Sequence, residues 1–169
     1  MISYLKGIIK HKTGRFVVVE VNGVGYQVFC PEKLIPDIGG PGDNAEFFIK
    51  LFVRDDALEL YGFEDMKQLE LFELLLGAQG IGPKASQAII GCGSVKDIIG
   101  AIEKGDEGFF KGIPNVGSKK IKKVILELSG KLPSKEDEQI EKSGFKDAYR
   151  ALVSIGFSSQ DVREALKAL

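Results

Sequence analysis

The chain has 169 residues, of which 44% are hydrophobic and 28% are charged, and its formal net charge is −1. This length is enough for one medium domain or two to three small ones with apolar cores. No stretch is both apolar and long enough to span a bilayer, and the N-terminus lacks a signal-peptide pattern, so we expect a cytoplasmic protein outside the membrane.

Residues 1–63 have the pattern of short strands. Residues 15–30 contain β-branched and aromatic runs on both sides of an Asn-Gly step, which favours a tight hairpin turn. Residues 46–63 form a second expected strand pair, with a turn near residues 54–57. Short strands with turn signals and no long helix predict a small barrel or sandwich. A five-stranded oligonucleotide-binding (OB) barrel fits the length, and the pattern leaves an SH3-like barrel open.

Residues 64–130 change to a period near 3.6, which is typical of helices. A short turn sequence occurs twice here, as Gly-Ile-Gly-Pro-Lys at 80–84 and Asn-Val-Gly-Ser-Lys at 115–119. Each copy precedes an expected helix, so the region contains an internal repeat. The expected helices cover residues 65–79, 83–91, 94–105, 106–113 and 117–130.

The last part of the chain divides into a linker and a small helical unit. Residues 131–143 carry one isolated Ile and no periodicity, which indicates an exposed linker. Residues 144–169 contain two amphipathic segments. Two short helices bury little surface, so we expect this unit to be at the lower limit of independent stability.

The repeated turns have a physical use as phosphate sites. Glycine allows close backbone approach, and the helix that follows points its unpaired N–H groups and positive dipole end outward. Lys84 and Lys119 stand at the same offset and add a cation. A single copy is explained equally well by tight packing, whereas two copies favour phosphate binding. Such contacts position a nucleic acid without reading its bases.

The local charge around these turns agrees with a polyanion ligand. Residues 79–123 contain eight Lys and four acidic residues, although charge alone would favour a solvated helix face. Lys120, Lys122 and Lys123 lie in the opening turns of the last helix, where they oppose its dipole. Lysines in that place do not stabilise the helix, which indicates an external anion.

Other chemistry has little support in the sequence. The P-loop pattern is missing, and we expect no cofactor. Cys30 and Cys92 lie far apart in different kinds of segment, so neither a metal site nor a disulfide is expected.

With residues 1–63 in front and "ALVSIGFSSQDVREALKAL" behind, the paired turns resemble tandem helix–hairpin–helix motifs, and the whole chain resembles the RuvA family. The resemblance implies a multidomain α+β protein with an OB-type barrel, a tandem helix–hairpin–helix domain and a UBA-like C-terminal domain. It implies a non-catalytic protein that binds four-way (Holliday) junctions in recombination, repair and the SOS response. The implied partners are junction DNA, a RuvB-type hexameric ATPase for branch migration and a RuvC-type resolvase. The implied assembly is a homotetramer, with an octamer on DNA as the alternative.

The resemblance implies functional roles for three groups of residues in this chain. Asp55 and Asp56 correspond to an acidic pin, which without the resemblance is an ordinary turn. Leu152, Ile155 and Phe157 correspond to contacts with the motor, and the core of the small domain explains them almost equally well. The DNA-binding positions are Gly80, Gly82, Lys84, Asn115, Gly117, Lys119, Lys120 and Lys123.

The chain departs from the family pattern at three points. Asn115 stands where the second turn usually has Gly, and Asn tolerates left-handed backbone angles best among the other residues. Lys120 and Ile121 replace a small Thr-Ala pair, and the C-terminal unit has two expected helices where three are typical.

Two rival classes remain at this stage. A nuclease or glycosylase would need an acidic metal cluster or a base-flipping pocket. Asp55 and Asp56 are the only adjacent acids in the expected barrel, and His11 is the only histidine of the chain. A single-strand binder would stack bases on barrel aromatics, for which the candidates are Phe16, Phe29 and Phe48. A place in the barrel core explains these three more simply.

Overall fold

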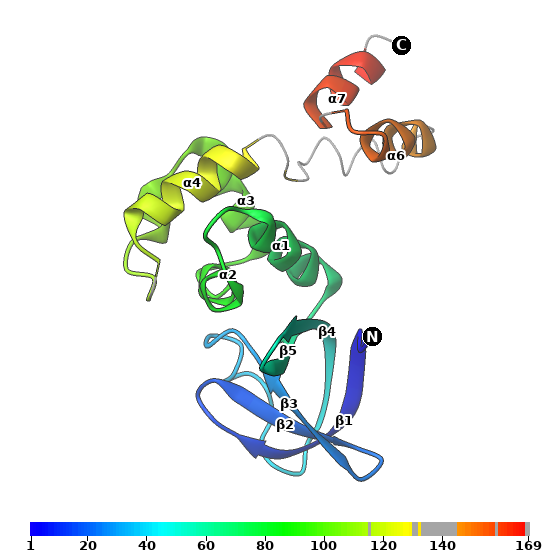
Figure 1. The fold of residues 1–169 in the computed structure, drawn as a ribbon, viewed down its shortest axis with the longest axis vertical. Helices are drawn as coiled ribbons and strands as arrows, with labels where there is room; N and C mark the ends of the chain where they lie inside the picture. Colours follow the sequence, from blue (N-terminus) through cyan, green and yellow to red (C-terminus); the bar gives the residue numbers. More distant parts are fainter. Residues whose placement is uncertain (115, 130–131, 133–144, 158, 168–169) are drawn as a thin grey trace.

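The computed structural model describes residues 1–114, 116–129, 132, 145–157 and 159–167. Figure 1 shows a barrel of strands at the N-terminal end, helices packed against one side of it, and two helices near the C-terminus. The domain boundaries predicted above stay predictions, and the predicted linker, Leu132 apart, lies outside the described residues, as does Asn115.

Five strands close into the predicted barrel in the order β1-β2-β3-β5-β4. Neighbours pair antiparallel except β3 and β5, which pair parallel, and this is the arrangement of the OB-type barrel. Asn22 and Gly23 both have positive φ, so the predicted tight hairpin turn is confirmed. The strands are β1 (Tyr4–Lys12), β2 (Phe16–Val21), β3 (Val24–Phe29), β4 (Asn44–Arg54) and β5 (Ala57–Phe63).

All five helical segments expected between residues 64 and 130 are present. Asp65 accepts a hydrogen bond from Gln68 N at the start of α1, and Ser94 accepts one from Asp97 N at the start of α3. Gly105, with φ of 68°, ends α3 as a left-handed cap. The segments are α1 (Met66–Gly77), α2 (Pro83–Ile90), α3 (Val95–Lys104), the 3₁₀ helix η1 (Glu107–Phe110) and α4 (Ser118–Leu128).

Aromatic side chains join the barrel to the helices. Tyr61 and Phe63 of β5 pack on Phe72 of α1, with ring centroids 5.4 and 4.8 Å away. Phe29 and Phe48 pack against the same helical cluster rather than inside the barrel. Their expected place in the barrel core is therefore wrong, because neighbouring strand residues point to opposite faces. The helices therefore partly cover these two rings.

Two helices follow near the C-terminus, α6 (Lys146–Ser154) and α7 (Ser159–Lys167). Tyr149, Val162 and Leu166 form their small buried cluster, which agrees with the expected amphipathic pattern. Gly156 follows α6 with φ of 105°, so glycine suits the turn between the helices. The UBA-like assignment stays a prediction.

Two glycines offer opposite stability predictions. A Cβ at Gly7 in β1 would lie 2.1 Å from the Glu20 carbonyl oxygen, whereas a Cβ at Gly100 in α3 meets nothing within 4 Å. We expect Gly7→Ala to lower the unfolding free energy by about 3 kcal/mol through overpacking. Gly100→Ala should raise it by up to about 1 kcal/mol. Urea denaturation measures both, and equal stability of the two variants would contradict the close packing at Gly7.

The two cysteines should react with thiol reagents at different rates. Burial in the barrel raises the pKa of the Cys30 thiol to about 12, and burial also raises that of Cys92, which is less enclosed. Because the thiolate is the reactive form, Cys92 should be labelled first in the folded protein and Cys30 only after unfolding. Mass spectrometry of the labelled peptides measures the order. Labelling of Cys30 first in the folded protein would contradict its place in the core.

Candidate nucleic-acid interface

The first glycine turn is a hydrogen-bonded β-turn. Ile81 N donates to Ala78 O at 3.1 Å, and Gly80 has φ of 81°, which a residue with a Cβ rarely adopts. Ile81 is buried and anchors the turn in the helical core. Gly82 is extended and serves as the N-cap of α2. The exposed backbone of the turn therefore leads directly into the start of a helix.

The second turn has the same construction. Val116 N donates to Ile113 O at 3.3 Å, Val116 is buried, and Gly117 is the extended N-cap of α4. Pro114 stands in the second position of this turn, where its fixed φ is favourable. Thus the described residues on both sides of position 115 repeat the anchoring of the first turn.

The starts of α2 and α4 differ from those of their neighbours. Neither has a side-chain hydrogen bond at its N-cap, whereas Asp65, Ser94 and Asp106 cap α1, α3 and η1 within the described helical region. Helix N-termini carry unpaired N–H groups and a partial positive charge. The two helices that follow the glycine turns thus leave these groups available to an anion.

Three of the lysines that the sequence predicts to bind DNA are exposed in the first turns of these two helices. Lys84 belongs to the first turn of α2, and Lys119 and Lys120 to the first turn of α4; all three are exposed. In the part of the chain that the structure describes, no salt bridge joins any of them to an acid. Lys122, by contrast, lies 3.7 Å from Glu107. The structure thus gathers two cations at α4 and one at α2.

Lys123 lies beside the first turn although it belongs to α4. Its Nζ donates to Gln79 Oε1 at 3.0 Å, and Gln79 immediately precedes Gly80. An ammonium group has three donors, so this bond leaves two for another acceptor. The sequence repeat had associated Lys123 with the second turn. Its contact with Gln79, 44 residues earlier, has no sequence signal.

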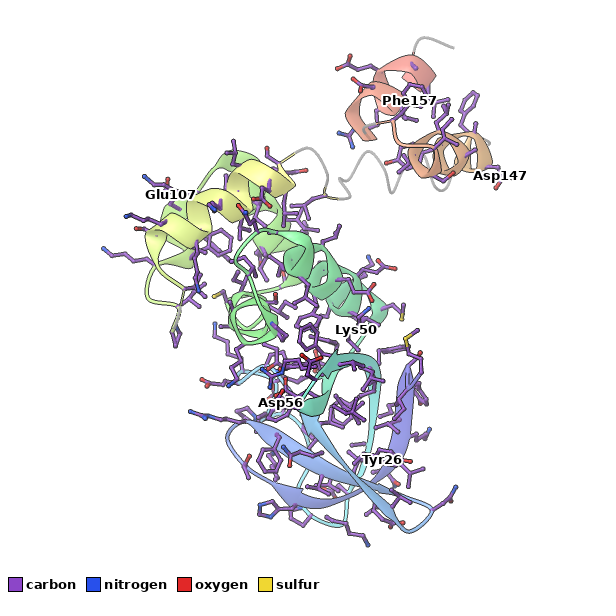
Figure 2. The ribbon with its side chains drawn as sticks, viewed as in Figure 1. Tyr26, Lys50, Asp56, Glu107, Asp147 and Phe157 are labelled. Atoms are coloured by element: carbon purple, nitrogen blue, oxygen red, sulfur yellow. The ribbon has the colours of Figure 1, made fainter. Side chains whose placement is uncertain are left out.

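The predicted acidic pin is the turn between β4 and β5. Asp55 and Asp56 are both exposed there, and Figure 2 labels Asp56. Below them Glu59 accepts hydrogen bonds from Arg54 Nη2 at 3.1 Å and from Tyr61 Oη at 2.8 Å. Burial is the main cause that raises the pKa of Tyr61, with the Glu59 hydrogen bond next. This network fixes the base of the hairpin. Arg54 Nε also lies 3.8 Å from Asp56 Oδ1, so the Asp56 carboxylate is exposed but is paired with a cation at the base of the hairpin.

The three predicted partner-contact residues are in different environments. Leu152 packs against the small core of α6 and α7, so the core explanation holds for its burial. Ile155 and Phe157 have 72% and 55% of their surface exposed. Large apolar side chains that are exposed within two residues of each other in sequence are candidates for a contact surface.

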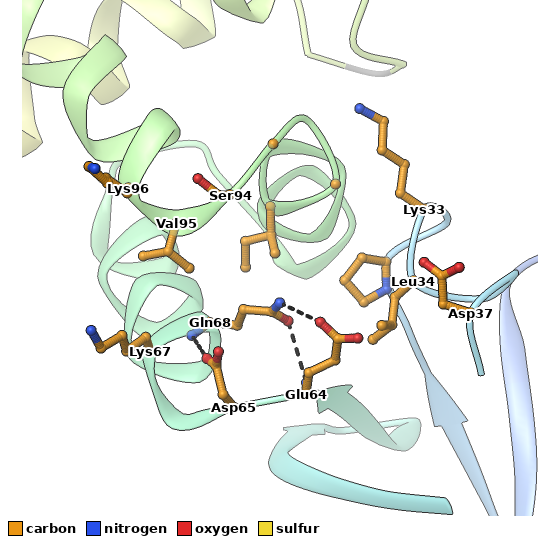
Figure 3. Close-up of a pocket in the computed structure, with 14 residues that line it drawn as sticks. Lys33, Leu34, Asp37, Glu64, Asp65, Lys67, Gln68, Ser94, Val95 and Lys96 are labelled. Carbon is orange, nitrogen blue, oxygen red and sulfur yellow. Dashed lines mark hydrogen bonds between the residues drawn. The ribbon is translucent and has the colours of Figure 1, made fainter. Parts of the chain in front are cut away.

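A cavity of about 460 Å³ lies away from the two turns, between the loop after β3 and the starts of α1 and α3 (Figure 3). Its lining includes three lysines and three acids. Two of these acids already bind Gln68: Glu64 accepts from its Nε2 at 3.1 Å, and Asp65 from its backbone N–H at 2.8 Å. None of the predicted binding residues lines this cavity.

No group of three or more His, Cys, Asp or Glu side chains gathers as a metal site among the described residues. His11 packs against Phe16 in the barrel, with ring centroids 6.2 Å apart. Of the helices that the structure describes, none has the length and apolar character needed to cross a membrane.

The fold and the paired turns define a class: a five-stranded OB-type barrel followed by a tandem helix–hairpin–helix region. Family models agree, since the RuvA N-terminal domain matches residues 1–62 and the SAM-like helix-hairpin-helix tandem matches residues 72–129.

Relatives extend this match to nearly the whole chain. Those from Syntrophobacter fumaroxidans, Oenococcus oeni and Shouchella clausii are 35%, 37% and 36% identical to it. The matches cover 98%, 97% and 100% of this chain and 87%, 87% and 89% of the relatives. Each relative is named Holliday junction branch migration complex subunit RuvA. The chain belongs to the RuvA family.

Proposed function

We propose that this protein binds four-way DNA junctions by their shape, without reading sequence, and holds them for branch migration. The observation that carries the proposal is the pair of glycine turns. Each turn is anchored by a buried apolar residue and followed by a helix that has no side-chain hydrogen bond at its N-cap and has at least one exposed lysine in its first turn. Two such sites fit two phosphate backbones. The relatives' names, which mention the Holliday junction, support the same ligand.

The proposed DNA contacts are of two kinds. Backbone N–H groups at the starts of α2 and α4 bind phosphate oxygens, and lysine side chains add charge. At the first turn the lysines are Lys84 and Lys123, and at the second they are Lys119 and Lys120. The backbone positions are Gly80, Gly82, Asn115 and Gly117.

The exposed carboxylates of Asp55 and Asp56 supply the opposite charge. Placed at the centre of a junction, they would repel phosphates and keep the strands of neighbouring arms apart. The Arg54–Glu59–Tyr61 network would hold this acidic pin in position against the DNA.

The relatives' names mention a complex, and this supports a role as one subunit of a larger assembly. In our proposal the protein is a non-catalytic homotetramer in the cytoplasm, or an octamer on DNA, that recruits a RuvB-type hexameric ATPase. A RuvC-type resolvase is a further proposed partner. Exposed Ile155 and Phe157 are the proposed contacts for the motor, beside Leu152.

A gel-shift titration tests the proposed ligand. A labelled synthetic four-way junction is titrated with the protein, and unlabelled junction, linear duplex and single strand of the same sequences compete. We expect the junction to compete better than the duplex by orders of magnitude. Equal competition by the duplex would contradict shape selection, and preference for the single strand would favour stacking on barrel aromatics instead. Mg²⁺-dependent cleavage of the junction would contradict a non-catalytic role.

A further inference from the structure

Glu127, near the C-terminal end of α4, contacts the first glycine turn, which lies much earlier in the sequence. Its Oε2 accepts a hydrogen bond from Gln79 N at 2.9 Å, across 48 residues of sequence. One turn earlier on the same face of α4, Lys123 donates to the Gln79 side chain at 3.0 Å. Gln79 is thus held at both its backbone and its side chain by one helix.

The bond from Gln79 N to Glu127 holds an N–H group that the hydrogen bond within the turn does not use. Gln79 is the second residue of the Ala78–Ile81 turn, and the internal bond of that turn uses Ile81 N. A carboxylate acceptor makes a strong bond to an N–H group, because the acceptor is charged. The bond therefore restricts rotation of the Ala78–Gln79 peptide, which opens the turn and lies one residue before Gly80 with its φ of 81°.

A carboxylate beside a phosphate site is unfavourable for DNA binding by charge alone. The position of Glu127 is explained if orienting the first glycine turn strengthens DNA binding by more than the repulsion weakens it. We propose that Glu127 is a positioning residue for the first glycine turn. It fixes Gln79 so that the start of α2 and Lys123 meet one phosphate backbone while the start of α4 meets the other. This inference rests on the proposed function, because it assumes that the first turn binds DNA.

Because Glu127 is negatively charged, a positioning role and a bystander role predict opposite changes in junction affinity when its side chain is removed. If Glu127 is a bystander, Glu127→Ala removes a negative charge near DNA and junction binding becomes equal or tighter. If Glu127 positions the turn, Glu127→Ala weakens binding by about tenfold, the size expected for losing one hydrogen bond to a charged group. Glu127→Gln keeps an acceptor without the charge, so it should bind as tightly as the wild type or more tightly.

The experiment measures junction dissociation constants by fluorescence anisotropy for the full chain and its variants. Glu103→Ala is the control, because it removes an exposed acid of α3 whose side chain has no hydrogen bond or ion pair within the described part of the chain. Its binding should be unchanged or slightly tighter. Hydrogen exchange of the Gln79 amide without DNA gives a second reading: faster in Glu127→Ala and unchanged in Glu127→Gln. Should Glu127→Ala fail to fold, Glu127→Asp, with its acceptor one methylene shorter, is expected to show the same weakening and faster exchange.

Lys84→Ala separates the failure of this inference from that of the proposed function. Weaker binding by Lys84→Ala together with unchanged or tighter binding by Glu127→Ala, or by Glu127→Asp in its place, overturns the positioning role alone. Unchanged binding by Lys84→Ala overturns the proposed DNA contact of the first turn. Weakening by Glu127→Gln equal to that by Glu127→Ala also overturns the positioning role, because the retained acceptor should rescue binding.

Discussion

Lys84→Ala and Lys119→Ala should each weaken junction binding and make it less sensitive to salt. Each lysine is exposed in the first turn of a helix that has no side-chain hydrogen bond at its N-cap. A lysine that neutralises a DNA phosphate there releases the counterions held by that phosphate. One lost phosphate contact makes the slope of log K against log salt less steep by about 0.9. If variant and wild type bind equally at 1 M salt, the variant should therefore bind about eightfold more weakly than the wild type at 0.1 M salt. The double variant should lose about twice that slope, because the two turns are separate sites.

The measurement is a series of anisotropy titrations of the four-way junction at several salt concentrations. Lys104→Ala is the matched control, since Lys104 is also exposed but lies in the last turn of α3, where it complements the helix dipole. Its salt slope should equal that of the wild type. An unchanged slope in both Lys84→Ala and Lys119→Ala would refute the phosphate contacts at the two turns.

Replacing Asp55 and Asp56 together by Asn should reduce selectivity for junctions. Both carboxylates are exposed at the tip of the β4–β5 hairpin, so their main effect on DNA is repulsion of phosphates. Two unit charges about 4 Å apart in water repel by about 1 kcal/mol. Two such repulsions amount to about 2 kcal/mol, so we expect linear duplex to bind up to about thirtyfold more tightly, while junction binding changes less.

The control for this variant is Glu70→Gln combined with Glu103→Gln, which removes the same charge from exposed helical positions. Parallel titrations of duplex and junction give the ratio of their affinities for each variant. If the pin variant keeps the wild-type ratio, or if the control lowers the ratio equally, the hairpin tip does not contribute to junction selection.

The sequence predicts the local parts of this fold well. Asn22-Gly23, the Ser94 cap and the periodic apolar residues of α1 to α4 are short-range signals, and each corresponds to an observed turn or helix. The repeat of glycine, apolar residue and lysine likewise predicts both turns, because their hydrogen bonds close within four residues.

Contacts between distant segments could not be predicted in the same way. The side of the barrel that packs on helices depends on how β3 to β5 curl, so Phe29 and Phe48 were wrongly expected inside it. The hydrogen bonds of Lys123 and Glu127 with Gln79 span more than forty residues and depend on how α4 packs beside α1. A local pattern carries no information on such packing.

A hydroxyl-radical footprint of the four-way junction would test the central claim most directly. Two glycine turns that bind phosphates should protect two backbone stretches on each bound arm, one on each strand. Lys84→Ala should weaken one of these stretches and Lys119→Ala the other. A single protected stretch per arm, or protection that neither variant changes, would contradict DNA binding by the paired turns.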